Sequence, residues 1–403
     1  MTDIDESKPS YHRDFDHSTA EWAATAPEIW DEYRQSCPVA RSDAFGGTWL
    51  PTRQEDISAI AHDTENYTSQ GVVVSVYRPE VDRPMGPAPP ITSDPPFHAI
   101  ARRLLLPPFA PKPIKALESY TRDYCNELID ELLDQGPEVD AAVGYAQNIP
   151  VRIIAKMLGM PEEDGDKFRT FIHRILETPG VEEELEYEET LDHYLDVQIA
   201  KHRENPRDPE VDGDLIDYLI NVEIEGQKLV DEHVRGSIAL LLIAGIDTTW
   251  SAIGASIWHM AQHPEHRAQL RDDPSIFPFA VEEMLRYYAP VTMARIAAQD
   301  HELGGCPVKE GDWLLLPFPA GNRDPEAFED ADQVILDRKQ NRHGAFGLGI
   351  HRCLGSNLAR MELHVALETF LERIPEFELA DPDGVRWSAG QIRGPRELPI
   401  RIL

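Results

Sequence analysis

The residues with the clearest chemical potential lie between Phe346 and Gly355, in the stretch FGLGIHRCLG. Cys353 comes just before apolar residues that recur at helical spacing, so we expect its sulfur near a helix N-terminus. Backbone N–H groups and the helix dipole favour a thiolate there, and Arg352 adds positive charge. Gly347 and Gly349 let the backbone approach a large flat group. An ionised cysteine in such a loop suits an axial ligand of haem iron, and a buried structural cysteine is the alternative.

A carboxylate and a hydroxyl, Asp247 and Thr248, lie inside the longest helical pattern of the chain, Asp231 to Gln262. The centre of this pattern, Ile238 to Ile246, is apolar on all sides, which predicts a helix buried in the core. Polar groups in a core are costly unless they are hydrogen-bonded or serve a function. An acid beside a hydroxyl is suited to moving protons. The alternative is a satisfied kink, in which each hydroxyl bonds to the carbonyl group one turn earlier.

Two further pairs of polar residues share helix faces. His98 and Arg102 lie four residues apart in a helix that begins after two prolines, and together they could hold a carboxylate. Glu283 and Arg286 lie three residues apart and could form an ion pair. For both pairs, a solvated helix face is the alternative.

The elements that must position these residues are predicted from apolar spacing and turn signals. We expect helices at 22–33, 55–62 and 279–288 and repeatedly between 115 and 205, a strand at 45–50, and a small β-sheet over 303–317. Residues 71–97 are irregular and contain seven prolines. The apolar run Val72 to Tyr77 within them favours a loop that covers a pocket over a surface linker.

The composition is that of a globular protein with an unusual charge. With 403 residues, 41% of them hydrophobic and 27% charged, the chain can form a large core. The formal net charge of −34 argues against nucleic acid or an anionic membrane as a partner. Four scattered cysteines without a CxxC pair argue against a cysteine zinc site or a disulfide framework. No apolar leader and no bilayer-length apolar run is visible, so we expect a cytoplasmic protein.

These motifs resemble those of the cytochrome P-450 superfamily, in particular its soluble, bacterial, ferredoxin-dependent haem–thiolate monooxygenases. The cysteine stretch resembles the haem-binding loop, and Ala244 to Thr249 resembles the oxygen-activation motif of the central helix. The Glu283 and Arg286 pair is similar to a buried structural pair of the family, and His98 with Arg102 is similar to its third-helix motif. The motifs occur in the family's order, and the resemblance covers about residues 90 to 380.

The resemblance implies a mainly α-helical fold with small β-sheets, in a single domain over residues 1–403. Because residues 1–20 are polar, we expect them to be loosely ordered until docked. Haem b would lie between the central helix and the cysteine loop. Cys353 would be the axial ligand of the iron, Thr248 would hydrogen-bond the oxygen being activated, and Asp247 would relay protons. The other implied haem contacts are Ala244, Gly245, Phe346, Gly347 and Gly355, with His98, Arg102, Arg295 and His351 as propionate ligands. The implied substrate pocket is lined by Val73, Val74, Tyr77, Ile172, Ile243, Ala244, Val291, Thr292, Ala294 and Ile392.

The structural pair departs from the family in one respect. The family often adds a later arginine to the glutamate and arginine, and the matching position here is Gln333. Arg323 is the substitute that the sequence offers for this third partner.

The implied reaction inserts one oxygen atom from O2 into a small or medium apolar or aromatic substrate, by hydroxylation or by oxidative O-demethylation. A peroxide-driven haem–thiolate peroxygenase and a non-enzymatic haem gas sensor or carrier are the alternatives. The presence of Asp247 and Thr248 favours the monooxygenase, because a peroxide route needs less proton delivery.

Residues 338–360 contain five Lys/Arg and no Asp/Glu, which reverses the charge of the rest of the chain. Such a patch could dock an acidic ferredoxin or balance propionates and nearby carboxylates. We favour the docking of a ferredoxin. No flavin, nicotinamide or iron–sulfur module is visible in the sequence, so a separate protein would supply the electrons. We expect the enzyme to be a monomer. The predicted patch consists of Arg338, Lys339, Arg342, Arg352 and Arg360.

Overall fold

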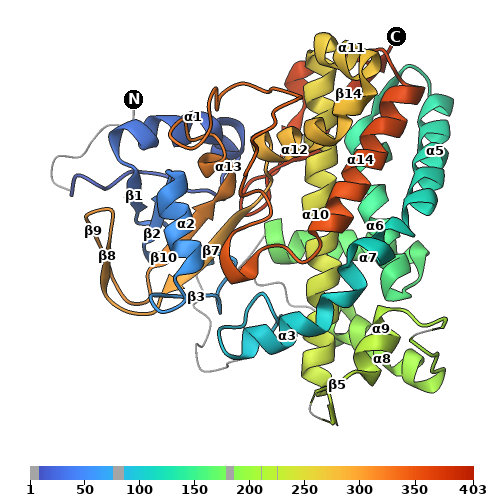
Figure 1. Ribbon diagram of the computed structural model, residues 1–403, viewed down its shortest axis with the longest axis horizontal. Coiled ribbons are helices and arrows are strands. Elements are labelled where there is room, and N and C mark those ends of the chain that lie inside the picture. The colour runs from blue at the N-terminus through green and yellow to red at the C-terminus, as the bar shows by residue number, and fades with distance from the viewer. Residues whose placement is uncertain (1–8, 76–85, 178–185, 210, 225) are drawn as a thin grey trace.

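The computed structural model describes residues 9–75, 86–177, 186–209, 211–224 and 226–403, and it combines a large helical part with a smaller part built around a β-sheet (Figure 1). The helices are α1 (Ala20–Ser36), α2 (Gln54–His62), α3 (Phe97–Leu105), α4 (Pro111–Lys115), α5 (Glu118–Asp134), α6 (Asn148–Leu158), α7 (Gly165–Ile172), α8 (Leu191–Glu204), α9 (Leu215–Asn221), α10 (Asp231–Gln262), α11 (Pro264–Asp272), α12 (Phe277–Tyr287), α13 (Phe318–Gly321) and α14 (Ser356–Arg373). The strands are β1 (Val39–Ser42), β2 (Thr48–Pro51), β3 (Tyr67–Thr68), β4 (Glu138–Asp140), β5 (Glu223–Ile224), β6 (Gln227–Lys228), β7 (Thr292–Ala297), β8 (His301–Leu303), β9 (Cys306–Val308), β10 (Trp313–Pro317), β11 (Phe377–Leu379), β12 (Arg386–Trp387), β13 (Pro395–Glu397) and β14 (Pro399–Ile402).

Helix α10 is the central element of the helical part, and it runs through the whole height of the molecule (Figure 1). It spans 32 residues, with Asp231 and Glu232 in its first turn, where the helix dipole favours negative charge. Helices α6 and α14 pack against it, and Ile238, Leu242 and Ile246 are fully buried in the shared core. Among the described helices, α10 alone has the length and apolarity to cross a membrane, but 67% of its most apolar window is buried inside the protein. The predicted buried helix is therefore confirmed as a core helix.

The largest sheet has the strand order β1-β2-β10-β7-β3 and lies beside α1 and α2 (Figure 1). Strand β7 pairs antiparallel with β10, with Arg295 opposite Leu314. A second sheet, β11-β14-β4, and three two-stranded hairpins complete the described sheets. The mainly α-helical fold with small β-sheets is confirmed.

The N-terminal segment is docked on the protein from Tyr11 onward. We expect residues 1–20 to be loosely ordered until docked; residues 1–8 lie outside the described part, and Tyr11 and Phe15 pack on the apolar core between α1 and the sheet. Phe15 is buried against Trp22 and Tyr33, and the Ser42 hydroxyl donates to the Phe15 carbonyl over 2.6 Å. Burial of this aromatic ring supplies the anchoring that the polar sequence around it did not indicate.

Candidate active site

The cysteine loop is closed by its own backbone. The Cys353 N–H donates to the Phe346 carbonyl over 2.7 Å, and α14 begins three residues after the cysteine. Gly347 and Gly349 have φ angles of 73° and 66°, which side chains with a Cβ rarely adopt. At Gly349 an added Cβ would also collide with the Ala61 carbonyl group of α2. These two glycines fix the turn that presents Cys353 at the start of α14.

The electrostatics at the sulfur differ from our expectation. Burial raises the pKa of the Cys353 thiol, although the Gly355 N–H and the positive charges of Arg102 and Arg352 act in the opposite direction. The helix N-terminus and the nearby positive charges therefore do not offset the effect of burial on the pKa of this thiol. A metal cation bound to the sulfur deprotonates a thiol outright, so the site suits a metal ligand better than a free nucleophile.

Helix α3 and strand β7 bring three nitrogen-bearing side chains to the cysteine loop, which supplies a fourth, His351. Arg102 donates from Nη2 to the Arg352 carbonyl over 2.6 Å, which fixes α3 beside Cys353. The rings of His98 and His351 lie 4.3 Å apart, and Nε2 of His351 is 2.9 Å from Ser69 Oγ. The four residues predicted to bind propionates are thus brought together: His98, Arg102, Arg295 and His351.

These side chains repel one another electrostatically. Burial, then Arg295 and His98, lower the pKa of His351 to about 2, and burial lowers the pKa of Arg295 to about 10. Burial and Arg102 also lower the pKa of His98. The buried Nε2 of His98 has no hydrogen-bond partner among the described residues. An anionic ligand with carboxylate groups would satisfy this nitrogen and neutralise the arginines, so the donor set fits the propionates of haem.

One stripe of α10 is accessible although the helix is buried on its other sides. Ala244 is exposed and Ile243, Gly245 and Thr248 are half-buried, whereas Ile246 and Asp247 are fully buried. The Thr248 hydroxyl donates to the Ala244 carbonyl over 3.0 Å, and the helix continues without interruption to Gln262. This is the satisfied arrangement that the sequence allowed as an alternative, with the hydroxyl still on the accessible stripe.

Asp247 lies on a different face of α10 from Thr248. Its carboxylate forms an ion pair with Arg396 of β13, with 2.7 Å between Oδ1 and Nη2. Arg396 also donates from Nη1 to Ser251 Oγ over 3.1 Å and lies 4.3 Å above the Trp250 ring. The sequence suggests that Asp247 and Thr248 act as a neighbouring acid and hydroxyl; in the structure the acid is buried against an arginine. This partner could not be predicted from sequence, because β13 is far from α10 along the chain.

Chain segments distant in sequence meet beside the accessible stripe. The Ala294 N–H donates to the Val72 carbonyl over 3.1 Å, and the Thr292 N–H donates to the Gln391 carbonyl over 2.9 Å. Val291 forms a β-bridge with Ile392, and α7, which carries Ile172, packs against α10. Of the other predicted pocket residues, Val73 is half-buried and Tyr77 lies outside the described residues.

Three predicted pocket residues point elsewhere. Ala294 and Val74 belong to the apolar core between α1 and the sheet. Alternation along β7 puts Thr292 on the Ala294 face and Met293 on the Arg295 face, so Met293 is the better pocket candidate. Prediction from sequence also missed Gln391, which donates to Val72 O and Met293 Sδ and whose buried Oε1 has no partner among the described residues. The sequence around β7 does not alternate clearly between apolar and polar residues. It therefore does not indicate which residues lie on the same face of the strand.

The predicted ion pair of α12 is confirmed and extended. Arg286 donates from Nη2 to Glu283 Oε1 over 2.8 Å, and both side chains are fully buried. The third partner is Arg338, whose Nε lies 3.0 Å from Glu283 Oε2. Arg323, the substitute suggested by the sequence, instead pairs with Asp31 at 3.6 Å. The family position at Gln333 contributes its backbone carbonyl, which accepts from Arg286 Nη2 over 2.6 Å.

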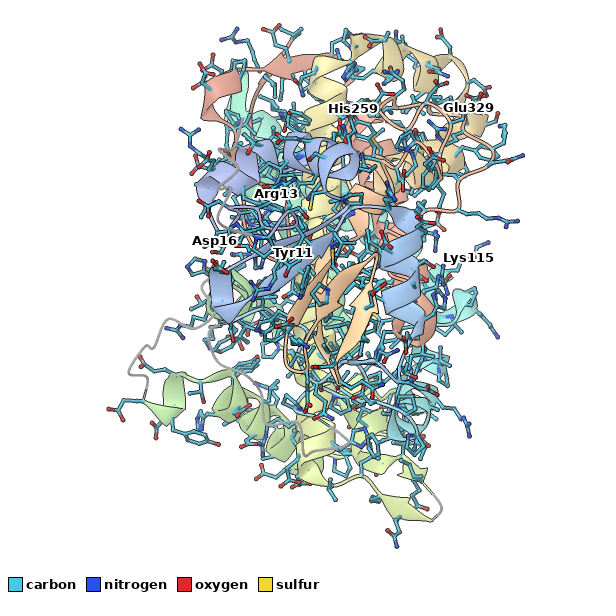
Figure 2. The ribbon with its side chains drawn as sticks, turned by 90° about the vertical axis from the view of Figure 1, so that its left-hand side faces the viewer. Tyr11, Arg13, Asp16, Lys115, His259 and Glu329 are labelled. Carbon is cyan, nitrogen blue, oxygen red and sulfur yellow. The ribbon has the colours of Figure 1, made fainter. Side chains whose placement is uncertain are left out.

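The predicted basic patch is only partly available to a partner. Arg338 is 8% exposed and committed to Glu283, and Arg360 forms an ion pair with Glu282 at 2.5 Å; we therefore correct their assignment to the docking surface. Lys339, Arg342 and Arg352 are exposed. Segment 107–115 packs against the start of α14, where Asn357 donates to the Phe109 carbonyl over 3.0 Å. This segment adds two exposed cations that could not be assigned to the patch from sequence, Lys112 and Lys115. Lys115 is labelled in Figure 2.

A buried acid, Glu362, lies on α14, the helix that follows the cysteine loop. It is 1% exposed, and its Oε2 has no hydrogen-bond partner among the described residues. Burial raises the pKa of Glu362 well above its usual value. The carboxyl group is therefore protonated in the folded protein, whereas it ionises near its ordinary pKa in the unfolded chain.

Replacing Glu362 with glutamine should make the free energy of unfolding depend less on pH. Above about pH 4.3 the unfolded wild-type chain loses a proton that the folded chain keeps, so stability falls by up to about 1.4 kcal/mol per pH unit. The glutamine variant lacks this slope, so its advantage over the wild type should grow from pH 5 to pH 8. Thermal unfolding at several pH values measures this, with Glu372→Gln on the exposed side of α14 as control. Equal slopes for the Glu362→Gln variant and the wild type would contradict a protonated Glu362.

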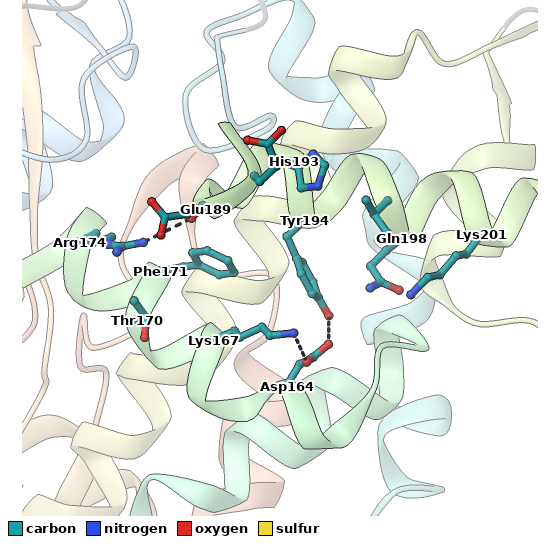
Figure 3. Close-up of a pocket in the computed structure, with 12 residues that line it drawn as sticks. Asp164, Lys167, Thr170, Phe171, Arg174, Glu189, His193, Tyr194, Gln198 and Lys201 are labelled. Atoms are coloured by element: carbon teal, nitrogen blue, oxygen red, sulfur yellow. Dashed lines mark hydrogen bonds and ion pairs between the residues drawn. The ribbon is translucent and has the colours of Figure 1, made fainter. Parts of the chain in front are cut away.

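A separate surface pocket of about 450 Å³ lies between α7 and α8 (Figure 3). Asp164 forms its floor, with Lys167 Nζ at 2.6 Å and a hydrogen bond of 2.8 Å from the Tyr194 hydroxyl. None of the residues predicted to bind cofactor or substrate lines this pocket. It is therefore distinct from the site beside Cys353.

Comparison with known proteins gives consistent matches along most of the chain. The family model described as Cytochrome P450 matches residues 151–274 and 277–386. The chain is 33% identical to mycinamicin IV hydroxylase/epoxidase of Micromonospora griseorubida, over 92% of this chain and 94% of that protein. It is 34% identical to nocardicin C N-oxygenase of Nocardia uniformis subsp. tsuyamanensis, over 87% and 89%. The solved structure of the bacillaene polyketide synthase cytochrome P450 PksS of Bacillus subtilis 168 superposes with a TM-score of 0.83 at 29% identity, over 96% of this chain and 99% of that chain.

Proposed function

Because this chain belongs to the cytochrome P450 family, we propose that it is a ferredoxin-dependent monooxygenase of small or medium apolar or aromatic molecules. Its membership makes it an oxidoreductase that binds haem b through an axial cysteine thiolate. The finer parts of the proposal are the substrate class, the electron donor, and a cytoplasmic, monomeric, single-domain enzyme. The names of the relatives, a hydroxylase/epoxidase and an N-oxygenase, support oxygen insertion as the reaction type.

The observation that carries the proposal is the cluster of four nitrogen-bearing side chains beside Cys353. His98, Arg295 and His351 are buried or half-buried together with Arg102, and their mutual repulsion is relieved by a dianionic ligand. Haem b has two propionates and an iron that needs an axial ligand, so one group meets the needs of the cluster and of the cysteine.

The residues of the chain divide the chemistry between two faces of α10. Haem b supplies the binding and reductive activation of O2. The Thr248 hydroxyl, on the accessible stripe, can leave the Ala244 carbonyl and donate toward that stripe. Asp247 would receive protons on a different face, where the ion pair with Arg396 orients its carboxylate. Proton delivery therefore requires the carboxylate to turn away from Arg396 or to pass protons through an intervening water.

The candidate pocket supports a mostly apolar substrate with one hydrogen-bond donor. Ile243, Ala244, Val291 and Ile392 present aliphatic groups. The unpartnered Oε1 of Gln391 offers one acceptor next to Met293. Hydroxylation and oxidative O-demethylation are both compatible with this lining, and screening by spin-state shift would select among candidate molecules.

The visible spectrum of the dithionite-reduced protein with carbon monoxide tests the proposed haem site. Ligation by the Cys353 thiolate should give a strongly red-shifted Soret band, and Cys353→His should lose that shift while keeping haem. Turnover with ferredoxin, reductase and NAD(P)H, compared with turnover on peroxide alone, then separates the monooxygenase from a peroxygenase. A wild-type band at the position typical of imidazole ligation would overturn the proposal in favour of a sensor or carrier.

Reversing exposed charges near the cysteine loop should weaken the proposed ferredoxin docking. For the variant Lys115→Glu with Arg342→Glu we expect the KM for an acidic ferredoxin to rise about tenfold at low salt, because like charges now face each other. The kcat at saturating ferredoxin should be unchanged, and the difference should shrink in about 0.5 M salt. Lys228→Glu on the β5–β6 hairpin, an exposed lysine on a different element, is the matched control. An unchanged KM would move the docking surface elsewhere.

A further inference from the structure

Three histidines gather at the C-terminal end of α10, where α11 begins. His259 lies about 16 Å along the helix axis from Thr248, and Figure 2 places it near the upper end of α10. The rings of His259, His263 and His266 stack, with centroids 4.2 Å, 5.0 Å and 5.2 Å apart. Nε2 of His259 lies 2.8 Å from Nδ1 of His266, and one nitrogen atom of each ring lies within 4.8 Å of the others.

The surroundings of the cluster hold the imidazoles in defined orientations. Nδ1 of His259 lies 2.8 Å from the Tyr288 hydroxyl, and Nδ1 of His263 lies 2.9 Å from Glu265 Oε1. When these Nδ1 atoms carry the protons, both rings present an Nε2 lone pair; that of His259 accepts from Nδ1 of His266, and a cation would replace the proton of this contact. The carboxylate and the hydroxyl then act as the outer partners that metal-binding histidines usually have.

The cluster favours neutral rings over imidazolium ions. Burial, then His263 and His266, lower the pKa of His259 to about 3, and burial lowers the pKa of His266. The nearby Arg267 donates to the Met260 carbonyl and to Glu376, so its charge is turned toward other groups. Neutral imidazoles with free lone pairs are the form in which histidine binds metals.

We propose that His259, His263 and His266 form a binding site for a late first-row divalent metal such as Zn²⁺ or Cu²⁺, separate from the haem. Three imidazoles are a donor set that these ions prefer. The site would join the end of α10 to the first turn of α11. Water would complete the coordination, because the side chains of His263 and Glu265 are 42% and 63% exposed.

The geometry needs only side-chain adjustment. Ligand nitrogens at about 2.0–2.1 Å from a tetrahedral zinc ion are about 3.3–3.4 Å apart. His259 and His266 must therefore separate slightly from their 2.8 Å contact, and the His263 nitrogen already lies within 4.8 Å of both. His263 is 42% exposed and His266 is half-buried, so both rings can turn while His259 stays fixed by Tyr288.

A second grouping of potential ligands in the described part of the chain is less suitable. His202, Asp214 and Asp217 also lie close together. There, Arg207 forms ion pairs with both aspartates, with Nη2 at 2.7 Å from Asp217 Oδ2. The arginine takes the place that a cation would need, whereas the histidine cluster contains no such cation.

Calorimetric titration of the haem-loaded, chelator-treated protein with ZnCl₂ tests the proposal. We expect the wild-type protein to bind one zinc ion per chain. In the double variant His263→Gln with His266→Gln, the dissociation constant for zinc should be at least 100-fold larger. His62→Gln, a histidine exposed at the end of α2, should leave the affinity unchanged. The carbon monoxide spectrum of every variant should equal that of the wild type, which separates this site from the haem site.

A second measurement covers the case in which the double variant does not fold. Cu²⁺ added to the wild-type protein should give an electron paramagnetic resonance spectrum with hyperfine coupling to several imidazole nitrogens. Binding of zinc equally well by the folded double variant, or a copper spectrum without nitrogen coupling, would overturn the proposal. The stacked rings would then be a hydrogen-bonded cluster that closes the junction of α10 and α11.

Discussion

Replacing Thr248 with alanine should reduce the fraction of electrons recovered in product by about tenfold or more, while reductant and O2 continue to be consumed. The Thr248 hydroxyl lies on the accessible stripe at the centre of α10. In that stripe Ala244 is exposed and Ile243 and Gly245 are half-buried. Its proton donor is lost in the variant, and positioned proton transfer typically contributes about 10²–10⁴-fold to enzymatic rates. Electrons not used for oxygen insertion should appear as hydrogen peroxide.

The neighbouring threonine provides a matched control. Thr249 is buried and lies on another face of the same turn, so Thr249→Ala should change stability more than coupling. Thr248→Ser retains the hydroxyl and should recover most of the coupling. Peroxide release per NAD(P)H, measured with a substrate found by spin-state screening, compares the three variants. If Thr248→Ala and Thr249→Ala uncouple to the same extent, Thr248 has no special role in proton delivery.

Replacing Glu283 with alanine should destabilise the protein by about 3–5 kcal/mol, because it leaves the buried charges of Arg286 and Arg338 without their carboxylate. Although burial alone would raise it, hydrogen bonds and charge from Arg286 hold the pKa of Glu283 below its usual range. The acid is therefore ionised in the folded protein and binds both arginines. Arg286 also donates to the backbone carbonyls of Asn322 and Ala331, so loss of Glu283 should loosen the segment that leads to the cysteine loop.

Thermal unfolding at one fixed scan rate, followed by the Soret absorbance, measures this effect in the holoprotein. Glu138→Ala is the control, because Glu138 pairs with Arg401 at 2.9 Å on the surface, where such a pair contributes about 0–1 kcal/mol. If Glu283→Ala does not yield folded protein, Glu283→Gln, which keeps the shape but not the charge, gives the comparison. A stability change no larger than that of the surface control would show that the buried network is dispensable.

The parts of the site that could be predicted from sequence are those held within one short segment. The glycines and cysteine of the loop, the polar interruption at Asp247 and Thr248, and the pairing of Glu283 with Arg286 are all local, because helical or turn geometry alone brings the residues together. The apolar centre of α10 likewise predicted its burial. The family resemblance added the grouping of His98 with His351 and Arg295, which local spacing does not contain.

Contacts between distant segments could not be predicted in the same way. The excess of positive charge in residues 338–360 suggests that Arg338 belongs to a docking surface. In the folded protein its side chain instead points inward and pairs with Glu283. Arg396 reaches Asp247 because Gly394 lacks a Cβ that would collide with Ser251, a fit that becomes visible only in three dimensions. Thr292 and Ala294 were misassigned because the face of a strand depends on its register, and nothing in the short segment fixed the register of β7.

The segment that ends in β13 links two properties that enzyme engineers usually treat as independent. Within six residues it carries Gln391 and Ile392, at the candidate pocket, and Arg396, the ion-pair partner of Asp247, which we propose relays protons. Directed evolution of this segment toward a new substrate would therefore shift the backbone that holds Arg396. Variant libraries at these positions should be selected for product yield per electron as well as for substrate turnover. One substitution in this segment can change both the substrate selectivity and the fraction of reductant that is wasted.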